Sequence, residues 1–336
     1  MGLALRGVMS LRSLLGVALI LPTGAALYAL FAPSASVSAA ATFTSSAQCQ
    51  DCHPEVYAEW KTSWHSRSWI DPEVRARSND FANAECVSCH APQPVFQTGI
   101  DERVLPRDSR REEGVDCIAC HASADEGRVV GTLERADVAC KPVAEADLSG
   151  PAFCAACHNQ HETFLEWLVS GYAAQGIDCI DCHMPFRGGD PLRGRDHTMH
   201  GGHSLELLQA AVDLRARREG DLVRVEVENV GAGHCFPTDE NSRAADVFWR
   251  PIEPAPGAWR FLYRFRSPFR DELDVEETVL PPHTVRELTI EDREAAGAIE
   301  VALFYKLTPY WADPLHPDPE AEARLVERVE LEGSAR

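Results

Sequence analysis

Five copies of one pentapeptide, Cys-x-x-Cys-His, carry the clearest chemistry in this sequence. Two thiols on one turn of the chain can form thioether bonds with the two vinyl groups of a haem, and the histidine that follows can bind the iron as its first axial ligand. The pattern therefore predicts five covalently attached haem c groups. The copies begin at Cys49, Cys86, Cys117, Cys154 and Cys179.

Zinc sites and thioredoxin-like redox pairs also use the Cys-x-x-Cys spacing, but neither requires a histidine directly after the second cysteine. Here every Cys-x-x-Cys is followed by histidine, and the copies use ten of the 12 cysteines. Haem is therefore preferred over zinc or a disulfide framework. The predicted thioether residues are Cys49, Cys52, Cys86, Cys89, Cys117, Cys120, Cys154, Cys157, Cys179 and Cys182, and the predicted proximal ligands are His53, His90, His121, His158 and His183.

A second axial ligand decides what each haem can do. An iron with one protein ligand can bind small molecules, whereas an iron with two is closed and suited to electron transfer. The sequence has 13 histidines, so eight remain beside the five proximal ones. These eight are His65, His161, His197, His200, His203, His234, His283 and His316.

Two of these candidates follow haem motifs closely. His65 ends an aromatic segment, residues 54–68, that is expected to be helical, and it lies too far along that helix to reach the haem of its own motif. His161 lies about one turn beyond His158 and is also expected to bind a different haem. For His65 the alternative is a buried structural histidine.

Glycines surround the other candidates. His197, His200 and His203 lie within eight residues that end in Gly-Gly-His, and glycine lets a backbone approach a porphyrin closely. We expect one or two of the three to bind iron and the remainder to bond propionates or solvent. His234 lies in a glycine-rich loop at a strand end, where it either binds iron or forms an inter-domain hydrogen bond. His283 and His316 stand beside prolines and are expected in surface loops.

The net charge of the chain indicates which classes of molecule it can bind. The 336 residues carry a formal net charge of −20, from 52 acidic and 32 basic side chains. Such a surface repels nucleic acid and favours redox proteins with basic docking surfaces by long-range attraction. A surface that is acidic only for solubility is the alternative.

The N-terminus resembles an export sequence. Residues 1–32 contain Arg6 and Arg12 followed by an apolar run, and small residues come next, in a linker over 33–44. The apolar run is just long enough to cross a bilayer, so a cleaved signal peptide and an uncleaved membrane anchor both remain open. Either one places the remainder of the chain in the periplasm or elsewhere outside the cytoplasm. An uncleaved segment would also anchor the protein to the inner membrane.

Two domains are expected in the remainder. Residues 45–205 hold all five motifs at irregular intervals and should form short helices and loops around the haems. Residues 206–336 alternate apolar and polar side chains in short runs with Pro- and Gly-rich links, which is typical of an antiparallel β-sandwich. The predicted fold class is therefore α+β. The expected strands cover 212–216, 222–228, 244–249, 259–265, 284–290 and 299–307, and 324–331 is either a strand or a short helix.

Cys140 and Cys235 lie outside the motifs. An exported protein permits a disulfide between them, and two free buried thiols are the equal alternative.

Several segments resemble the multihaem c-type cytochromes of the cytochrome c552/c554 group. The first motif, with Tyr57, Trp60 and His65 after it, is similar to that group's opening haem segment, in which the later histidine is a distal ligand. The motif at Cys117 resembles an internal motif of the group. The closing segment from Cys179 onward is similar as well, and it favours His197 and His203 over His200 as distal ligands.

The loop that carries His234 is similar to a Gly-His-x-x-Pro-Thr element in relatives with a β-domain. This chain has no Cys-x-x-Cys-Lys motif of the kind that marks ammonia-forming nitrite reductases, and no recognisable crosslinked tyrosine as in hydroxylamine oxidoreductases. Both differences argue against an enzyme.

The expected function is electron transfer by an exported cytochrome with five mostly bis-histidine haems, whose distal ligands are drawn from His65, His161, His197, His203 and His234. One alternative is an oxidoreductase with one open haem that acts on a small nitrogen or sulfur compound. Another is a docking subunit of a membrane respiratory complex.

Overall fold

The computed structural model describes residues 43–333 except 101, 125–127, 161, 221, 239–242, 270–271 and 292. The described residues belong to one compact unit, Ala41–Arg336. The predicted N-terminal export segment and His161 lie outside the described residues. No helix in the described part of the chain is long and apolar enough to cross a membrane.

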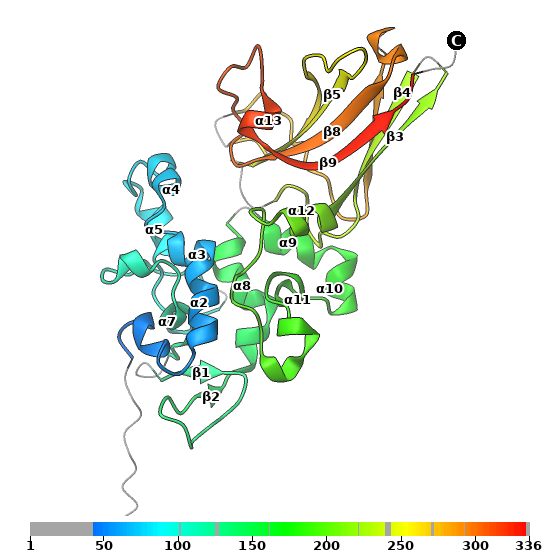
Figure 1. The fold of residues 1–336 in the computed structure, drawn as a ribbon. Coiled ribbons are helices and arrows are strands. Elements are labelled where there is room, and N and C mark those ends of the chain that lie inside the picture. Colours follow the sequence, from blue (N-terminus) through cyan, green and yellow to red (C-terminus); the bar gives the residue numbers. More distant parts are fainter. Residues whose placement is uncertain are drawn as a thin grey trace, which may run out of the picture. The chain divides into compact units, whose positions relative to one another are not determined.

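The segment with the motifs folds into short helices (Figure 1, blue to green). Each of four motifs forms the last turn of a helix, so that its histidine is the final helical residue. The α-helices are α2 (Pro54–Thr62), α3 (Trp64–Arg67), α4 (Pro72–Arg77), α5 (Ala84–His90), α6 (Val95–Thr98), α7 (Cys117–His121), α8 (Pro151–His158), α9 (Thr163–Leu168), α10 (Gly171–Gln175), α11 (Cys179–His183) and α12 (Leu205–Ala211).

Shorter elements complete this half of the molecule. They are the 3-10 helices η1 (Ser46–Cys49), η2 (Arg111–Glu113), η3 (Ala146–Ser149), η4 (Arg187–Gly189) and η5 (Pro191–Arg193), and the paired parallel strands β1 (Val130–Gly131) and β2 (Val143–Ala144).

Local sequence explains where these helices begin. Asn83 caps α5, Asp116 caps α7, and Asp178 forms a capping box with Asp181 at α11. Such side chains accept hydrogen bonds from the free N–H groups of the first turn and thereby fix the start of a helix. Three of the motif helices are therefore positioned by the residue just before them.

The aromatic segment expected as one helix over 54–68 is divided at Ser63. The extended backbone of Ser63 ends α2, and its hydroxyl accepts a hydrogen bond from Ser66 N–H at 3.2 Å as the cap of α3. The break places His65 on α3 and not on α2. Hydroxyl caps of this kind compete with helix continuation, and the apolar periodicity alone does not reveal it.

Two antiparallel sheets form the second half of the described chain (Figure 1, green to red). One sheet has the order β3-β4-β7 and the other β6-β5-β8-β9. The strands are β3 (Val212–Glu219), β4 (Leu222–Asn229), β5 (Ala244–Pro251), β6 (Arg260–Phe265), β7 (Val285–Ile290), β8 (Ile299–Lys306) and β9 (Arg324–Leu331); η6 (Arg293–Ala296) and α13 (Pro319–Glu322) lie in the connections.

One core joins the two sheets. Val225 and Val227 of β4 lie in the same apolar cluster as Val247 of β5 and Val301 and Leu303 of β8, and all five are fully buried. Each buried aliphatic side chain of this size contributes about 1.5–3 kcal/mol. The second half is thus a β-sandwich, and the predicted α+β fold class is confirmed. The segment 324–331, which the sequence left open, is a strand.

Candidate haem-binding site

Thiols from different motifs lie beside one another. Cys49 of the first motif and Cys117 of the third are within hydrogen-bonding reach, and this contact raises the pKa of Cys49 and lowers that of Cys117. The first and third motifs are therefore neighbours in space, although the second motif separates them in the sequence.

The fourth motif lies at the centre of the remaining contacts. Its Cys157 bonds with Cys89 of the second motif and lowers the pKa of Cys89 to about 7. Its Cys154 bonds with Cys179 of the fifth motif and likewise lowers the pKa of that thiol to about 7. Cys120 of the third motif contributes electrostatically to the raised pKa of both cysteines of the fourth motif. The fourth motif thus adjoins the second, third and fifth motifs.

Three histidines from outside the motifs face motif histidines across a gap of nearly constant width. The ring centroids of His65 and His158 are 6.1 Å apart, those of His121 and His197 are 6.4 Å apart, and those of His183 and His234 are 6.1 Å apart. Two metal–nitrogen bonds of about 2 Å place the ligating nitrogens about 4 Å apart, and each ring centroid lies about 1 Å behind its nitrogen. The centroids of two imidazoles on opposite sides of one iron are therefore about 6 Å apart. The three pairs therefore fit axial ligation of three haem irons.

Backbone carbonyls orient most of these rings. Nδ1–H of His121 donates to Val130 O at 3.0 Å, that of His197 to Arg195 O at 2.8 Å, and that of His234 to Cys235 O at 2.9 Å. Nδ1 carries the proton in each case because a carbonyl only accepts. Nε2 consequently keeps its lone pair, as an iron ligand must.

The same arrangement holds for two further motif histidines. His90 donates from Nδ1 to Ser68 O at 2.8 Å, and His183 donates to His200 O at 2.5 Å. The Ser68 hydroxyl in turn donates to His90 O at 2.7 Å. Fixed ring orientation is therefore a common property of the predicted ligands on both the proximal and the distal side.

His65 is half-buried on the short helix α3. Burial, together with the charges of His158 and His183, lowers the pKa of His65 to about 3, so the ring is neutral at physiological pH. Its Nδ1 contacts Met199 Sδ, and its carbonyl accepts a hydrogen bond from Val115 N–H at 2.9 Å. A Cβ on Gly114, which has a φ of +62°, would lie 2.4 Å from that carbonyl, so only glycine fits there.

Glu59 on α2 fixes the backbone that carries His197. Its two carboxylate oxygens each accept a hydrogen bond of 2.6 Å from Arg187, and one of them also accepts from His197 N–H at 3.0 Å. Arg187 is the main cause of the lowered pKa of Glu59. A bidentate pair of this kind has a defined geometry, so the loop before His197 is held in one position.

Replacing Glu59 by alanine is expected to loosen His197 on the haem of the third motif. Two charged hydrogen bonds and one backbone bond are lost, which should lower the free energy of unfolding by about 2 kcal/mol. Absorption spectra of the oxidised protein should show a partly high-spin iron. Glu55→Ala is the control, because Glu55 lies on the same helix but only reaches Arg193 at 3.6 Å with both side chains exposed. An unchanged Glu59→Ala spectrum would contradict this role.

The other histidines have different surroundings. The ring of His203 stacks on Trp64 with centroids 3.7 Å apart, and Nε2 of His200 bonds Thr198 at 2.8 Å. His283 stacks on Tyr172 with centroids 5.1 Å apart, and His316 pairs with Asp313 while 83% exposed. His203, a predicted distal ligand, is thus not placed opposite a motif histidine among the described residues.

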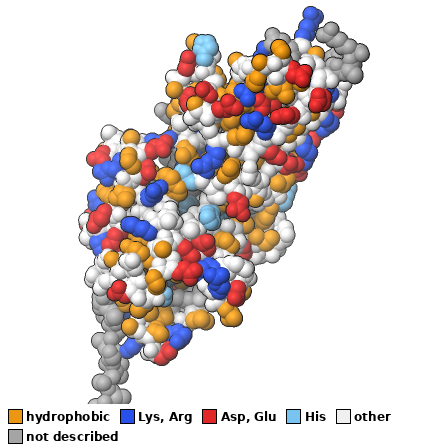
Figure 2. Space-filling model, in the orientation of Figure 1, with side chains coloured by type: hydrophobic (Ala, Val, Ile, Leu, Met, Phe, Trp, Pro, Cys, Tyr) orange, Lys and Arg blue, Asp and Glu red, His pale blue; other side chains and the backbone are white. Residues whose placement is uncertain are grey.

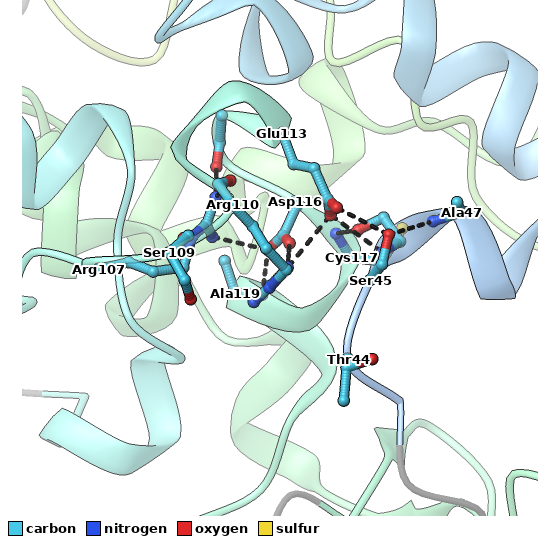
Figure 3. A network of polar contacts seen from close by, with 12 residues as sticks. Thr44, Ser45, Ala47, Arg107, Ser109, Arg110, Glu113, Asp116, Cys117 and Ala119 are labelled. Carbon is cyan, nitrogen blue, oxygen red and sulfur yellow. Dashed lines mark hydrogen bonds and ion pairs between the residues drawn. The ribbon is translucent and has the colours of Figure 1, made fainter.

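A buried polar network joins the first and third motifs (Figure 3). Asp116, which caps α7, is fully buried and pairs with Arg107 at 3.1 Å and with Arg110. Arg110 also pairs with Glu113, which accepts hydrogen bonds of 2.7 Å from the Ser45 hydroxyl and 3.0 Å from Ser46 N–H. This network fixes η1, which ends at Cys49, against the helix that begins at Cys117.

All three guanidinium nitrogens of Arg107 donate hydrogen bonds within this network. Besides Asp116 it donates to the carbonyls of Pro92, Ser109, Arg110 and Gly114 at 2.7–3.1 Å. Burial raises the pKa of Asp116, and the two arginines oppose that shift. No motif in the sequence pointed to Arg107 or Glu59. The partners of Glu59, Arg187 and His197, are distant along the chain.

A cavity of about 180 Å³ adjoins the first and third motifs, and its walls include Cys49, Cys117 and His121. On the second motif, Phe81 lies 5.4 Å from His90 between ring centroids and belongs to a small apolar cluster. Apolar walls next to predicted proximal ligands suit a porphyrin, which is itself apolar over most of its area.

The two remaining cysteines have different neighbours. Both are free thiols; Cys140 acts electrostatically on Cys49, while Cys235 lies beside Glu166, where burial raises its pKa to about 12.

The chain is similar to known proteins in part of its sequence and in its fold. Residues 48–122 match the family model described as cytochrome c554 and c-prime. Among solved structures, the penta-heme cytochrome c552 from Thermochromatium tepidum is similar with a TM-score of 0.66 and 19% identity, over 86% of this chain and 98% of that chain. A superoxide reductase matches 37% of this chain and 88% of its own at 13% identity, with a TM-score of only 0.20.

Proposed function

We propose that this chain, a multihaem c-type cytochrome of the cytochrome c552/c554 group, transfers electrons through five covalently bound haems. The three facing histidine pairs are the observation that carries the proposal. Iron held by two imidazoles is closed to substrates and changes little on reduction, which favours electron transfer over bond chemistry. In these pairs His158 binds with His65, His121 with His197, and His183 with His234.

The thiol contacts support a route for the electron. The first motif adjoins the third, the third adjoins the fourth, and the fourth adjoins both the second and the fifth. We propose that electrons pass among the haems in this order, with the haem of the fourth motif as the junction. The exposed thiols Cys52 and Cys182 mark the first and fifth haems as those nearest to solvent.

The haems of the first and second motifs admit a second function. Within the part of the chain that the structure describes, ring contacts bring no second histidine to His53 or His90. His161 and His203 remain the proposed distal ligands for these irons. If either iron is open, it would bind a small nitrogen or sulfur compound, and the protein would be an oxidoreductase.

Potentiometric titration of the haem-loaded protein tests the proposal. We expect five haems per chain by pyridine haemochrome, reversible uptake of five electrons, and no steady turnover of nitrite or hydroxylamine. Sustained turnover would contradict the electron carrier and favour the enzyme, whereas fewer than five haems would contradict the proposed number of haems.

We propose further that the protein is exported and that its redox partners carry basic docking surfaces. Acidic and basic side chains alternate over the visible face (Figure 2), yet the net charge is −20. A docking subunit of a membrane complex would share this chemistry and would co-purify with membranes.

The second-order rate constant for reduction by a cationic metal–ammine complex should fall as ionic strength rises, because salt screens the attraction. Stopped-flow absorption measures this rate. A neutral reductant is the control and should show little dependence on salt. A rate for the cationic complex that rises with salt would contradict the proposed partner charge.

A further inference from the structure

We infer that Glu166 is a positioning residue for the axial ligand His234. The inference rests on the proposed function, since His234 must bind iron for its position to matter. Glu166 lies on α9, shortly after the fourth motif, whereas His234 lies in the loop after β4 and faces His183 of the fifth motif.

Glu166 binds the His234 loop at two places. Its Oε2 accepts a hydrogen bond from Cys235 N–H at 3.0 Å and another from the Thr238 hydroxyl. Thr163, on the same helix, bonds Thr238 at 3.0 Å between the two hydroxyl oxygens. Glu166 and Thr163, on one face of α9, therefore hold both ends of the Cys235–Thr238 segment.

Cys235 connects this contact to the ligand itself. Its N–H donates to Glu166, and its carbonyl accepts the Nδ1–H of His234 at 2.9 Å. A hydrogen bond to the outer nitrogen of a ligating histidine sets both the ring rotation and its basicity toward the metal. By fixing the Cys235 backbone, Glu166 acts on the iron through His234.

Close packing leaves the loop few other positions. A Cβ on Gly233 would lie 3.2 Å from Cγ of Tyr172 and 3.5 Å from Cδ1 of Trp167, and a Cβ on Gly231 would lie 2.1 Å from Ala210 O. Trp167 is anchored in turn by a hydrogen bond of 2.9 Å to Ile177 O, just before the fifth motif. The same helix thus contacts the ligand loop and the segment that leads to the haem.

Glu166 is a carboxylate in a partly buried position, and the cost of burying it supports a specific role. Burial raises the pKa of Glu166, and the bonds from Thr238 and Cys235 oppose that rise. An apolar side chain would avoid this cost but would leave Cys235 N–H without its acceptor.

The test compares Glu166→Ala, Glu166→Gln and His234→Ala in the haem-loaded protein. Carbon monoxide bound per chain to the reduced form, the EPR spectrum of the oxidised form, and the midpoint potential of the affected haem are measured. His234→Ala should add about one CO-binding iron per chain. Glu166→Ala should add a fraction of one and shift the EPR signal and potential of the same haem. Glu166→Gln should stay near wild type, because its amide oxygen can accept both bonds.

The controls separate the two claims. Glu162→Ala, an exposed carboxylate at the start of the same helix, should leave all three readouts unchanged. If His234→Ala binds no additional CO, His234 is not a ligand and the proposed pair fails with the inference. If His234→Ala opens a haem but Glu166→Ala matches wild type, the inference alone is overturned. Should Glu166→Ala fail to load haem, Thr238→Val removes one of the two hydrogen bonds that Glu166 accepts. It should shift the potential of the same haem by a smaller amount, and an unshifted potential would contradict the inference.

Discussion

Replacing His65 by alanine is expected to open the iron of the fourth motif, with the largest functional effect of any single histidine outside the motifs. About one of five irons per chain should become high-spin and bind CO when reduced, because the facing imidazole of His158 would be its only remaining protein ligand. EPR and CO titration measure the change.

The effect should extend beyond one haem. The fourth motif contacts the second, third and fifth motifs through its thiols, so an altered potential there interrupts the route between the haems on either side. Internal electron transfer, followed after rapid reduction of the protein, should slow in His65→Ala while the haem count stays at five.

His200→Ala is a matched control. His200 belongs to the same histidine cluster as His197, but its Nε2 bonds Thr198, and only its backbone carbonyl contacts His183. This variant should retain the wild-type spectrum and CO stoichiometry. If His65→Ala remains fully low-spin, the pairing of His65 with His158 is wrong.

Replacing Arg107 by methionine is expected to cause the largest loss of stability. Asp116 would keep Arg110 but lose one of two charged partners in a fully buried site, and four backbone carbonyls would each lose one hydrogen bond. Removing one partner of a buried ion pair costs about 3–5 kcal/mol. Chemical denaturation followed by circular dichroism should show the decrease in the free energy of unfolding.

Arg135→Met is the control for this variant. Arg135 makes two hydrogen bonds of 2.8 Å to Asp137, so the pairing resembles that of Arg107, but both side chains are more than half exposed. Exposed pairs contribute little because water screens them. Equal stability of Arg107→Met and Arg135→Met would show that burial of the network is not what stabilises the fold.

The strands could be predicted from the sequence where the pattern of apolar and polar side chains determines the structure. The alternation through Val223, Val225 and Val227 predicted β4, and all three are buried in the sandwich core. The strand at 299–306 was also predicted, although it is buried on both faces and therefore lacks alternation. The break at Ser63 was not predicted, since the hydroxyl cap there depends on one hydrogen bond rather than on a pattern.

The site was predictable in type but not in pairing. The motifs predicted the haem cofactor, and the list of distal candidates included His65, His197 and His234. Which motif each one faces depends on tertiary packing, because His65 precedes its partner His158 in the sequence whereas His234 follows its partner His183, and both pairs are far apart along the chain. The assignment of every distal ligand stays a prediction, including His161, which the structure does not describe, and His203, which it places on Trp64.

The residues that position the ligands were missed altogether. Glu59 and Glu166 look like ordinary surface carboxylates in their helices, and only the folded chain shows that they bind the loops carrying His197 and His234. No sequence pattern distinguishes an acidic residue that only faces solvent from one that positions a ligand loop.

Near-infrared magnetic circular dichroism of the oxidised, haem-loaded protein, combined with low-temperature EPR, tests the central claim most directly, because the two spectra together identify and count the axial ligand pairs. The three facing histidine pairs predict at least three low-spin bis-histidine irons per chain and at most two of any other kind. Fewer than three bis-histidine irons would contradict the account.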